Sequence, residues 1–233
     1  MNTVNAHQKT INLLLICGIL GAFLYPLTDI IAGNLYKGYS FNEQTVSELF
    51  AIGAPTSQLV VILFTISSLL FIVFASGIWL LSGGKRILRA LALMIFGNAV
   101  NSLILWNFFP MHMRGIQPTF TDTMHGILAI NPFVLASIIL GAVYFKNWFR
   151  YYSIVTILLL IVMVVFAVPK ALLVYENSPT PGLGIMERAS QYGHQLWHAV
   201  LAIVLLNRHV DFDTTFKLNF CAKNTPDRQA ANR

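Results

Sequence analysis

The sequence predicts an all-α integral membrane protein, built as a bundle of six transmembrane helices with both termini in the cytoplasm. Of its 233 residues, 56% are hydrophobic and only 10% are charged, against about 25% charged in an average soluble domain. Six stretches are apolar over roughly the 20 residues that a helix needs to cross a bilayer core of about 30 Å. These observations exclude a soluble globular protein.

The six predicted spans follow one another along the chain. The first is too long, and too closely followed by others, to be a cleaved signal peptide. The last is the most polar, because only residues 199–206 are continuously apolar. We therefore expect one transmembrane domain over residues 1–209 and a polar cytoplasmic tail over residues 210–233. The predicted spans are residues 11–33, 59–81, 87–109, 125–145, 153–175 and 187–206.

The basic residues set the predicted orientation. Most of the 15 Lys and Arg residues lie beside one set of helix ends, including the short turns at Lys85 and Lys146. Because Lys and Arg are enriched in cytoplasmic loops, this side is assigned to the cytoplasm and the longer loops face outward. Topology thus explains the net charge of +6, and no basic cluster predicts a nucleic-acid partner. The expected location is a cell membrane, the inner one if the chain is bacterial.

Polar side chains gather on the predicted outer side, which is therefore the candidate working face. Ionisable groups inside a span are costly unless they face a cavity or one another. In the sixth predicted span, Glu187, Gln191, His194 and His198 follow spacings of four, three and four. They lie on one face of a helix.

A zinc site is the chemistry that these histidines predict. His194 and His198, four residues apart, can bind one metal ion from one helix face, and His125 at the start of the fourth span is the candidate third ligand. Three histidines and a water form the open geometry of a catalytic zinc site. Asp122 or Glu187 would then orient a ligand or act as the general base. The alternatives are that the histidines only join helices, and that Asp122 caps the fourth helix.

Other polar residues have structural and functional interpretations. Thr45 and Glu48 match a capping box, whereas Ser47 between them would be a nucleophile only if a base lay beside it. An ion pair is expected between Asp29 and Lys170, which lie on different predicted helices. A local ion pair is expected between the neighbouring residues Glu187 and Arg188. Asn98 and Asn101 are expected to join helices by hydrogen bonds. His112 and Arg114 are expected to be solvated or to contact a lipid headgroup.

Several short motifs resemble a known family of polytopic membrane proteins. They are Val46-Ser47-Glu48-Leu49-Phe50 with Gly53-Ala54-Pro55, Phe109-Pro110, His125, and Gly184-Ile185-Met186-Glu187-Arg188. Together they resemble the domain-of-unknown-function family 998, over about residues 13–206. This resemblance implies a multi-span membrane protein and no particular activity.

A second resemblance rests on His194-Gln195-Leu196-Trp197-His198. This segment is similar to the last helix of the alkaline ceramidase and progestin-receptor-like superfamily of membrane hydrolases. The resemblance implies an intramembrane zinc site with His125, His194 and His198 as ligands. Three departures stand against it: that superfamily typically has seven spans, this chain has Thr121 where the superfamily places a serine, and no aspartate follows His125 within its span.

The function favoured by the sequence is a metal-dependent hydrolase, acting on a lipid or amphiphile at the outer face of the bilayer. Zinc is the expected cofactor, and the bilayer and a lipid substrate are the expected partners. Three alternatives stay open. They are a transporter with a polar path through Asp29, Lys170 and the histidines, a haem-binding electron carrier, and a structural or accessory membrane protein.

Overall fold

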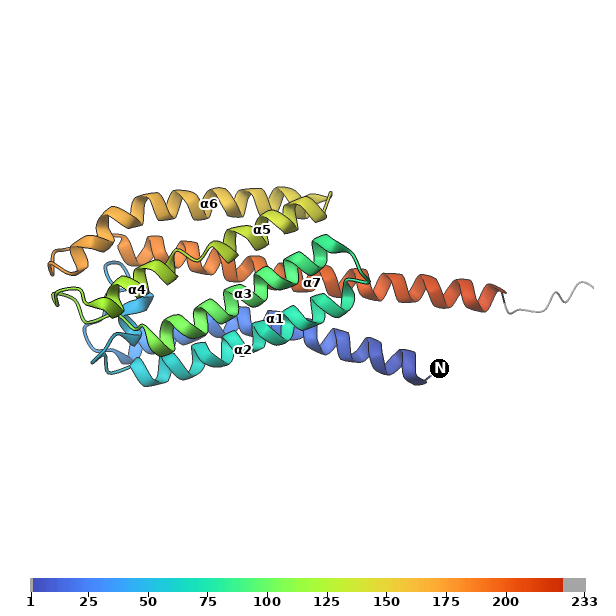
Figure 1. The fold of residues 1–233 in the computed structure, drawn as a ribbon, viewed down its shortest axis with the longest axis horizontal. Helices are drawn as coiled ribbons and strands as arrows, with labels where there is room; N and C mark the ends of the chain where they lie inside the picture. The colour runs from blue at the N-terminus through green and yellow to red at the C-terminus, as the bar shows by residue number, and fades with distance from the viewer. Residues whose placement is uncertain (1, 224–233) are drawn as a thin grey trace, which may run out of the picture.

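The computed structural model describes the backbone of residues 2–223 and the side chains of residues 6–207. Within these residues the fold is all-helical and contains no strand. Long helices run side by side along one axis, and both ends of the described chain lie at the same end of the bundle (Figure 1). The long helices are α1 (Asn2–Leu35), α2 (Ser57–Leu81), α3 (Arg86–Phe108), α6 (Trp148–Ala171) and α7 (Leu183–Lys223); the short ones are α4 (Phe120–Ala129), α5 (Pro132–Tyr144), and the 3₁₀ helices η1 (Val46–Phe50) and η2 (Leu172–Val174).

The membrane prediction is confirmed by the lengths and apolar character of these helices. Among the described residues, five segments are long and apolar enough to cross a bilayer. The chain is therefore an integral, multi-pass membrane protein. The five segments are Ala6–Leu35, Ser57–Leu81, Arg86–Phe108, Phe120–Tyr144 and Trp148–Val174.

The fourth predicted span is two helices rather than one. It begins at Phe120, earlier than predicted, and α4 ends before Asn131, whose side chain accepts a hydrogen bond of 3.2 Å from the N–H of Phe133. Pro132 stands at the start of α5, where its missing N–H costs nothing. The same Asn-Pro pair interrupts the helix because the residue before a proline disfavours helical geometry.

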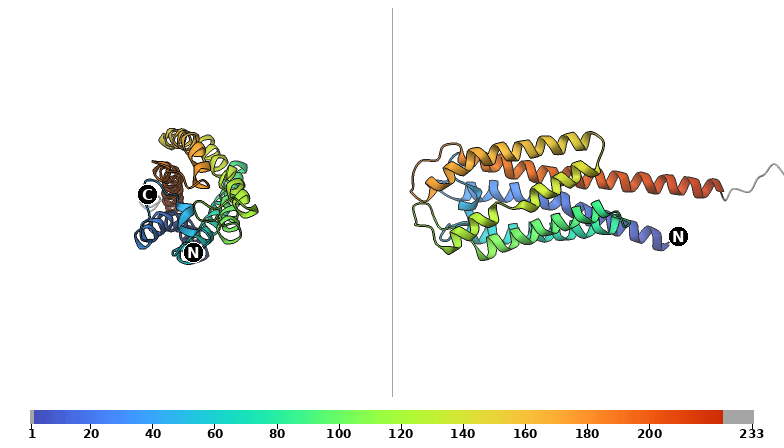
Figure 2. Two further views of the ribbon diagram at one scale, coloured as in Figure 1. Left: turned by 90° about the vertical axis from the view of Figure 1, so that its left-hand side faces the viewer. Right: turned by 45° about the horizontal axis from the view of Figure 1, so that its top comes forward.

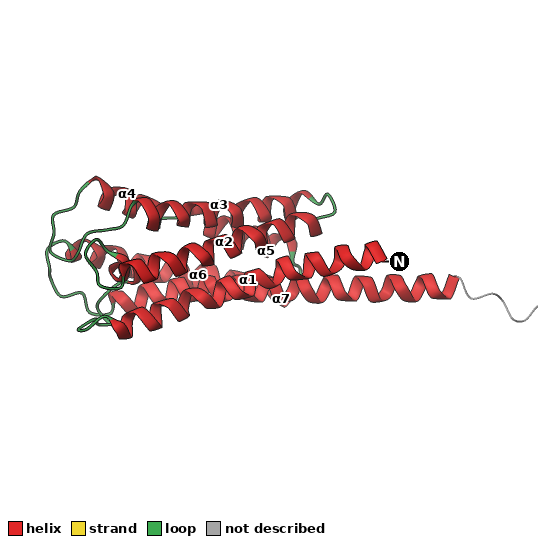
Figure 3. Ribbon diagram, turned by 90° about the horizontal axis from the view of Figure 1, so that it is seen from below, coloured by secondary structure: helices red, strands yellow, loops and turns green. Residues whose placement is uncertain are grey.

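The sixth predicted span is the first half of a much longer helix. α7 begins at Leu183 and continues to Lys223, through part of the predicted tail, and residues 224–233 lie outside the described residues. Its polar half runs along α1 and α6 rather than facing lipid all round (Figure 3). Trp197 shows how closely it packs, because this side chain is fully buried and its Nε1 donates to Ser153 Oγ at 2.9 Å.

Close helix contacts depend on small residues, which are common where membrane helices pack against each other. A Cβ atom at Gly77 of α2 would lie 2.8 Å from the Cβ atom of Leu14 on α1. The backbones of these two helices therefore approach too closely for any larger residue at position 77.

The loops 36–56, 109–119 and 172–182 meet at one end of the bundle, which we call the loop end (Figure 2). Backbone hydrogen bonds join them across long sequence separations. Ile52 N–H donates to the Met111 carbonyl at 2.8 Å, Gly115 N–H to the Val174 carbonyl at 3.0 Å, and Gly184 N–H to the Asn42 carbonyl at 3.0 Å. The loop end is thus an ordered structure, and it positions the candidate site.

Candidate active site at the loop end

The turn that carries Ser47 is fixed by a capping box. The Thr45 N–H donates to Glu48 Oε1 at 3.0 Å, and the Glu48 N–H donates to Thr45 Oγ1 at 3.3 Å, as the sequence predicts. The N–H of Val46 donates to Glu187 Oε2 on α7 at 2.7 Å. Ser47 therefore lies on a short helix that is fixed by its own capping box and by a hydrogen bond to α7.

Ser47 and His125 form a hydrogen-bonded pair. The Ser47 Oγ atom lies 3.1 Å from His125 Nε2, and His125 Nδ1 lies 2.8 Å from the carbonyl oxygen of Phe109. A carbonyl oxygen can only accept, so Nδ1 carries the proton and Nε2 is left to accept the hydroxyl proton of Ser47. The orientation required of a serine nucleophile and its base is thereby present in the resting geometry.

The surroundings of the pair combine burial with partial access. His125 is 7% exposed, and its ring lies against Phe50 with the ring centroids 5.8 Å apart. Ser47 is half-buried. A base shielded from water beside a reachable hydroxyl is the arrangement in which a serine can be activated and a substrate can approach.

Asp122 caps the helix that carries His125. The carboxylate accepts from the N–H and Oγ1 of Thr119 and from the N–H and Nδ1 of His112, each at 2.8 Å. Thr119 is the N-cap and Asp122 the third helical residue of the capping box. The helix therefore begins about one turn earlier than the sequence predicts, with Thr119 rather than Asp122 as its N-cap. The four groups that donate to the Asp122 carboxylate compete with any role of Asp122 as a general base.

Arg188 forms a buried ion pair with Asp29, which corrects two predictions. Nε and Nη2 of Arg188 donate to the Asp29 carboxylate at 2.8 and 2.9 Å, so the predicted Asp29–Lys170 pair is wrong, as is the predicted pair of Arg188 with Glu187. Lys170 Nζ instead donates to the carbonyl of Pro181 at 2.5 Å. A guanidinium can reach two carboxylate oxygens at once, which explains the preference for arginine.

Tyr39 completes this ion pair from the first loop. Arg188 Nη2 lies 2.5 Å from the Tyr39 hydroxyl oxygen, and the Tyr192 hydroxyl donates to Asp29. Burial raises the pKa of the Tyr39 phenol well above its usual value, and the neighbouring Arg188 guanidinium only partly offsets this. Tyr39 therefore stays neutral at physiological pH.

A second ion pair closes the outer surface of the loop end. Arg114 donates to both Glu48 oxygens, from Nη2 at 2.9 Å and from Nε at 3.1 Å. Nη1 also donates to Thr180 Oγ1 at 3.0 Å. The prediction that Arg114 is solvated or bound to a headgroup is wrong, because its charge is used to join three loops.

His194 and His198 are the other two predicted metal ligands. They lie within the bundle and have different partners from those of His125. His194 Nε2 is 3.4 Å from Asn98 Nδ2, and Asn98 Oδ1 accepts from Asn131 at 2.7 Å, so Asn98 joins helices as predicted. His198 Nδ1 lies 3.1 Å from the His194 carbonyl oxygen. Both rings are almost fully buried.

The three histidines do not converge on one point. Within the described residues, no three His, Cys, Asp or Glu side chains are grouped so that they could hold a metal ion. Both ring nitrogens of His125 face Ser47 and the Phe109 carbonyl. The described donors therefore do not fit a three-histidine centre, and zinc stays a prediction from the sequence.

The pairing of Ser47 with His125 could not be predicted from spacing, because 78 residues separate them. Their assignment to the same side of the membrane was the only available signal. Glu187, a predicted base, instead anchors the turn of Ser47 through Val46.

Comparison with known proteins assigns no chemistry to this arrangement. A family model described as a protein of unknown function, DUF998, matches residues 19–204. No curated protein and no solved structure matches the chain.

Proposed function

The chain belongs to the DUF998 family of proteins of unknown function, and from its loop end we propose that it is a serine hydrolase acting on an ester- or amide-linked lipid or other amphiphile. The single observation that supports this is the aligned set of Ser47, His125 and the Phe109 carbonyl. Each member matches a role in serine catalysis: nucleophile, general base and orienting acceptor.

The proposed reaction proceeds in two steps. Ser47 Oγ attacks the substrate carbonyl carbon while His125 Nε2 takes the hydroxyl proton, which it then gives to the departing alcohol or amine. The acyl group is left on Ser47. Water then attacks this ester while His125 takes a proton of the water, and His125 gives that proton to Ser47 Oγ as the acid leaves. The Phe109 carbonyl stabilises the imidazolium that forms in each step.

An amphiphilic substrate is favoured by the apolar side chains around the pair. Phe108, next to Phe109 in the chain, is 69% exposed, and Phe120 on the first turn of α4 is 72% exposed. Phe108 ends one apolar segment and Phe120 begins the next, so we infer that both rings lie near the depth of the lipid carbonyl groups. Such a surface suits the acyl chain of a lipid held in the membrane.

The test is labelling by a fluorophosphonate probe on the purified full-length protein in detergent. We expect covalent labelling at Ser47, its loss in Ser47→Ala, and a decrease of about 10²-fold or more in His125→Ala, since a general base contributes about 10²–10⁴-fold. Ser57 gives a matched control, because its hydroxyl donates to the Phe50 carbonyl at 3.1 Å and has no histidine partner among the described side chains. Ser57→Ala should label as the wild type does. A wild-type protein that is not labelled at Ser47 would overturn the proposal.

Transport is the second candidate, supported by the broken fourth span. The break at Asn131 lies beside Asn98 and His194, so polar groups from three helices meet inside the bundle. Interrupted helices with inward polar groups are common at transporter binding sites. Proton flux through liposomes containing the wild type but not His194→Phe would favour this function, and equal flux in both would exclude it.

A further inference from the structure

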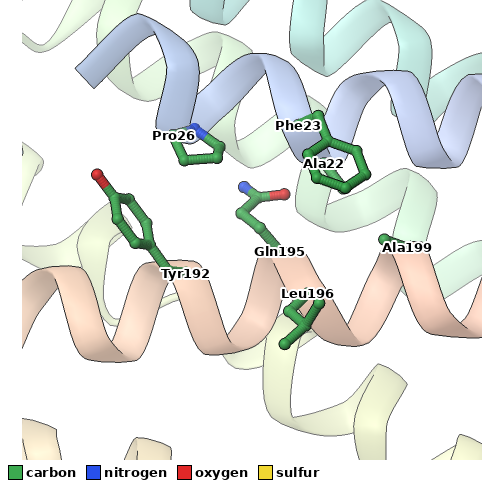
Figure 4. A pocket seen from close by; sticks show the side chains of 7 residues that line it. All are labelled: Ala22, Phe23, Pro26, Tyr192, Gln195, Leu196 and Ala199. Atoms are coloured by element: carbon green, nitrogen blue, oxygen red, sulfur yellow. The ribbon is translucent and has the colours of Figure 1, made fainter. Parts of the chain in front are cut away.

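Most of the surface that the helices present to lipid is apolar. A cavity of about 230 Å³ between α1 and α7, for example, is lined by apolar side chains except for one phenol and one amide (Figure 4). Both polar groups are turned to the protein, because the Tyr192 hydroxyl donates to Asp29 and Gln195 is only 6% exposed. Such a surface contacts acyl chains and does not distinguish one lipid headgroup from another.

Charge, in contrast, is divided between the two ends of the bundle. Among the described side chains, the acidic ones all belong to the loop end or to the helix turns beside it: Asp29, Glu43, Glu48, Asp122, Glu176 and Glu187. The opposite end is formed by the start of α1 and by the α2–α3 and α5–α6 turns (Figure 1). Its described charged side chains are Lys9, Lys85, Arg86, Arg89, Lys146 and Arg150. None of them forms an ion pair with a described side chain, so this end carries positive charge that the described residues do not neutralise.

Three of these residues form one group, which we call the basic turn: Lys85, Arg86 and Arg89. Lys85 is the N-cap of α3, and the two arginines lie in the first turn of this helix. Residues three and four positions apart are neighbours on a helix surface, and like charges at this spacing repel each other. All three side chains are exposed, and they form no hydrogen bond with described residues. An anion bound between them would therefore relieve the repulsion.

The guanidinium of Arg89 is held in place by an aromatic ring. Its central carbon lies 5.3 Å from the ring centroid of Trp79, which is 42% exposed on the last turn of α2. Stacking on a ring orients a guanidinium and leaves its N–H groups free to donate. A guanidinium with free donors can bind two oxygens of one phosphate. Tryptophan is also enriched at the depth of lipid headgroups.

The face of α3 that carries Arg89 continues as an apolar surface. Leu93 and Phe96 follow Arg89 by four and seven positions, so they lie on the same face of the helix. They are 51% and 45% exposed. A phospholipid presents a phosphate followed by an acyl chain in this same order, whereas a free phosphate or a nucleotide has nothing to place against Leu93 and Phe96.

We propose that the basic turn binds the phosphate of an anionic phospholipid, whose acyl chains lie along Leu93 and Phe96. An anionic lipid is favoured over a zwitterionic one, because no described acidic side chain at this end attracts the cation of a choline or ethanolamine headgroup. The predicted orientation puts the basic turn on the cytoplasmic side, where anionic lipids attract basic segments. The site lies at the opposite end of the bundle from Ser47 and does not depend on the proposed hydrolysis.

The test is native mass spectrometry of the delipidated full-length protein in detergent, titrated with dioleoylphosphatidylglycerol or dioleoylphosphatidylcholine. The two lipids have the same chains, so a difference in affinity comes from the headgroup. We expect phosphatidylglycerol to bind at least about five-fold more tightly, the effect of one basic residue near an anionic lipid. Arg86→Gln/Arg89→Gln should remove this preference. Lys9→Gln/Lys146→Gln is the matched control, because it takes two positive charges from the same end outside the basic turn, and it should keep the preference.

Further variants separate a lipid site from a folding defect and from other ligands. Arg89→Lys keeps the charge but loses the two-oxygen geometry, and it should weaken phosphatidylglycerol binding at an unchanged melting temperature. Glycerophosphoglycerol, the headgroup without acyl chains, should not displace the lipid at equal concentration. Ser47→Ala should bind both lipids as the wild type does, which separates this site from the hydrolase proposal.

Three results would refute the proposal. The first is equal binding of the two lipids by the wild type. The second is an equal loss of preference in the two double variants, which would indicate a diffuse positive potential over the whole end. The third is displacement of the lipid by glycerophosphoglycerol at equal concentration, which would indicate a site for a small phosphate compound.

Discussion

Arg188 and Asp29 are 159 positions apart in the chain and share two hydrogen bonds, of 2.8 and 2.9 Å, inside the loop end. Their exposures are 8% and 0%. Arg188 Nη1 also donates to the carbonyls of Phe41 and Gln44, at 3.0 and 2.9 Å. One guanidinium therefore joins α1, the first loop and α7.

Breaking this pair should destabilise the protein strongly. Arg188→Ala leaves a buried, uncompensated carboxylate, for which a loss of about 3–5 kcal/mol is expected. Thermal unfolding in detergent measures it, with Lys37→Ala, an exposed lysine of the same loop, as the control. The double variant Asp29→Leu/Arg188→Met should be more stable than Arg188→Ala, because no charge is left unpaired. A double variant that is less stable than Arg188→Ala would contradict this account.

Two glycines give a matched test of packing at the loop end. A Cβ atom at Gly184 would lie 2.3 Å from the Gln44 carbonyl oxygen and 2.5 Å from that of Phe41, whereas one at Gly126 meets nothing within 4 Å. Gly184→Ala should therefore cost about 1–3 kcal/mol or more, since overpacking forces the backbone to move. Gly126→Ala should be neutral or stabilise α4 by up to about 1 kcal/mol. Equal melting temperatures for the two variants would contradict this prediction, because they would mean that the loop backbone moves away from the new Cβ atom at no cost in stability.

The cap of α4 should control the position of His125. Asp122→Ala removes the capping box, with an expected loss of about 1–2 kcal/mol. Hydrogen exchange should become faster in the first turn of α4, and labelling of Ser47 should fall because His125 is in the next turn. His112→Ala keeps the Thr119 bonds and should have a smaller effect. Unchanged exchange in Asp122→Ala would rule out this role for the cap.

Tyr39 predicts a loss of stability at alkaline pH. Burial raises the pKa of its phenol in the folded state, so the folded protein holds the proton more tightly than the unfolded chain, whose tyrosines titrate near about 10. The resulting stability is complete below about pH 10 and is lost as pH rises further. Tyr39→Phe should flatten the unfolding profile above that pH, with Tyr151→Phe, a 69% exposed tyrosine, as the control. Identical alkaline profiles for wild type and Tyr39→Phe would refute the assignment.

The fold could be predicted largely from the sequence, because a membrane span is a local property. Length and apolar content locate each of the five apolar segments without knowledge of its neighbours. The break in the fourth span also had a local signal, the Asn131-Pro132 pair, which the predicted continuous helix did not take into account. The polar half of α7 was the exception, since α7 is not one of the five apolar segments found among the described residues, and its place in the bundle follows from packing against α1 and α6.

The site could be predicted only in part, because helix order around a bundle leaves no mark on the sequence. Thr45 and Glu48 were identified as a capping box from their local spacing, whereas Asp122, considered as the N-cap of its helix, is the third helical residue of a box whose N-cap is Thr119. The partners of His125 and Arg188 come from distant segments of the chain. For that reason the predicted ion pairs Asp29–Lys170 and Glu187–Arg188 were wrong. The predicted grouping of His125 with His194 and His198 is not found among the described residues. A pairing across the bundle depends on which helices are adjacent, and only the three-dimensional arrangement provides this.

The hydrogen bond from Val46 to Glu187 has a consequence for biosynthesis. Ser47 is made early, with the first helices, but the group that anchors its turn belongs to α7, and Glu187 follows Val46 by 141 residues. The nascent chain therefore carries Ser47 without this anchor until α7 has been made. A chain arrested before α7 should carry an unassembled Ser47 turn, so that addition of α7 is the step that completes the turn.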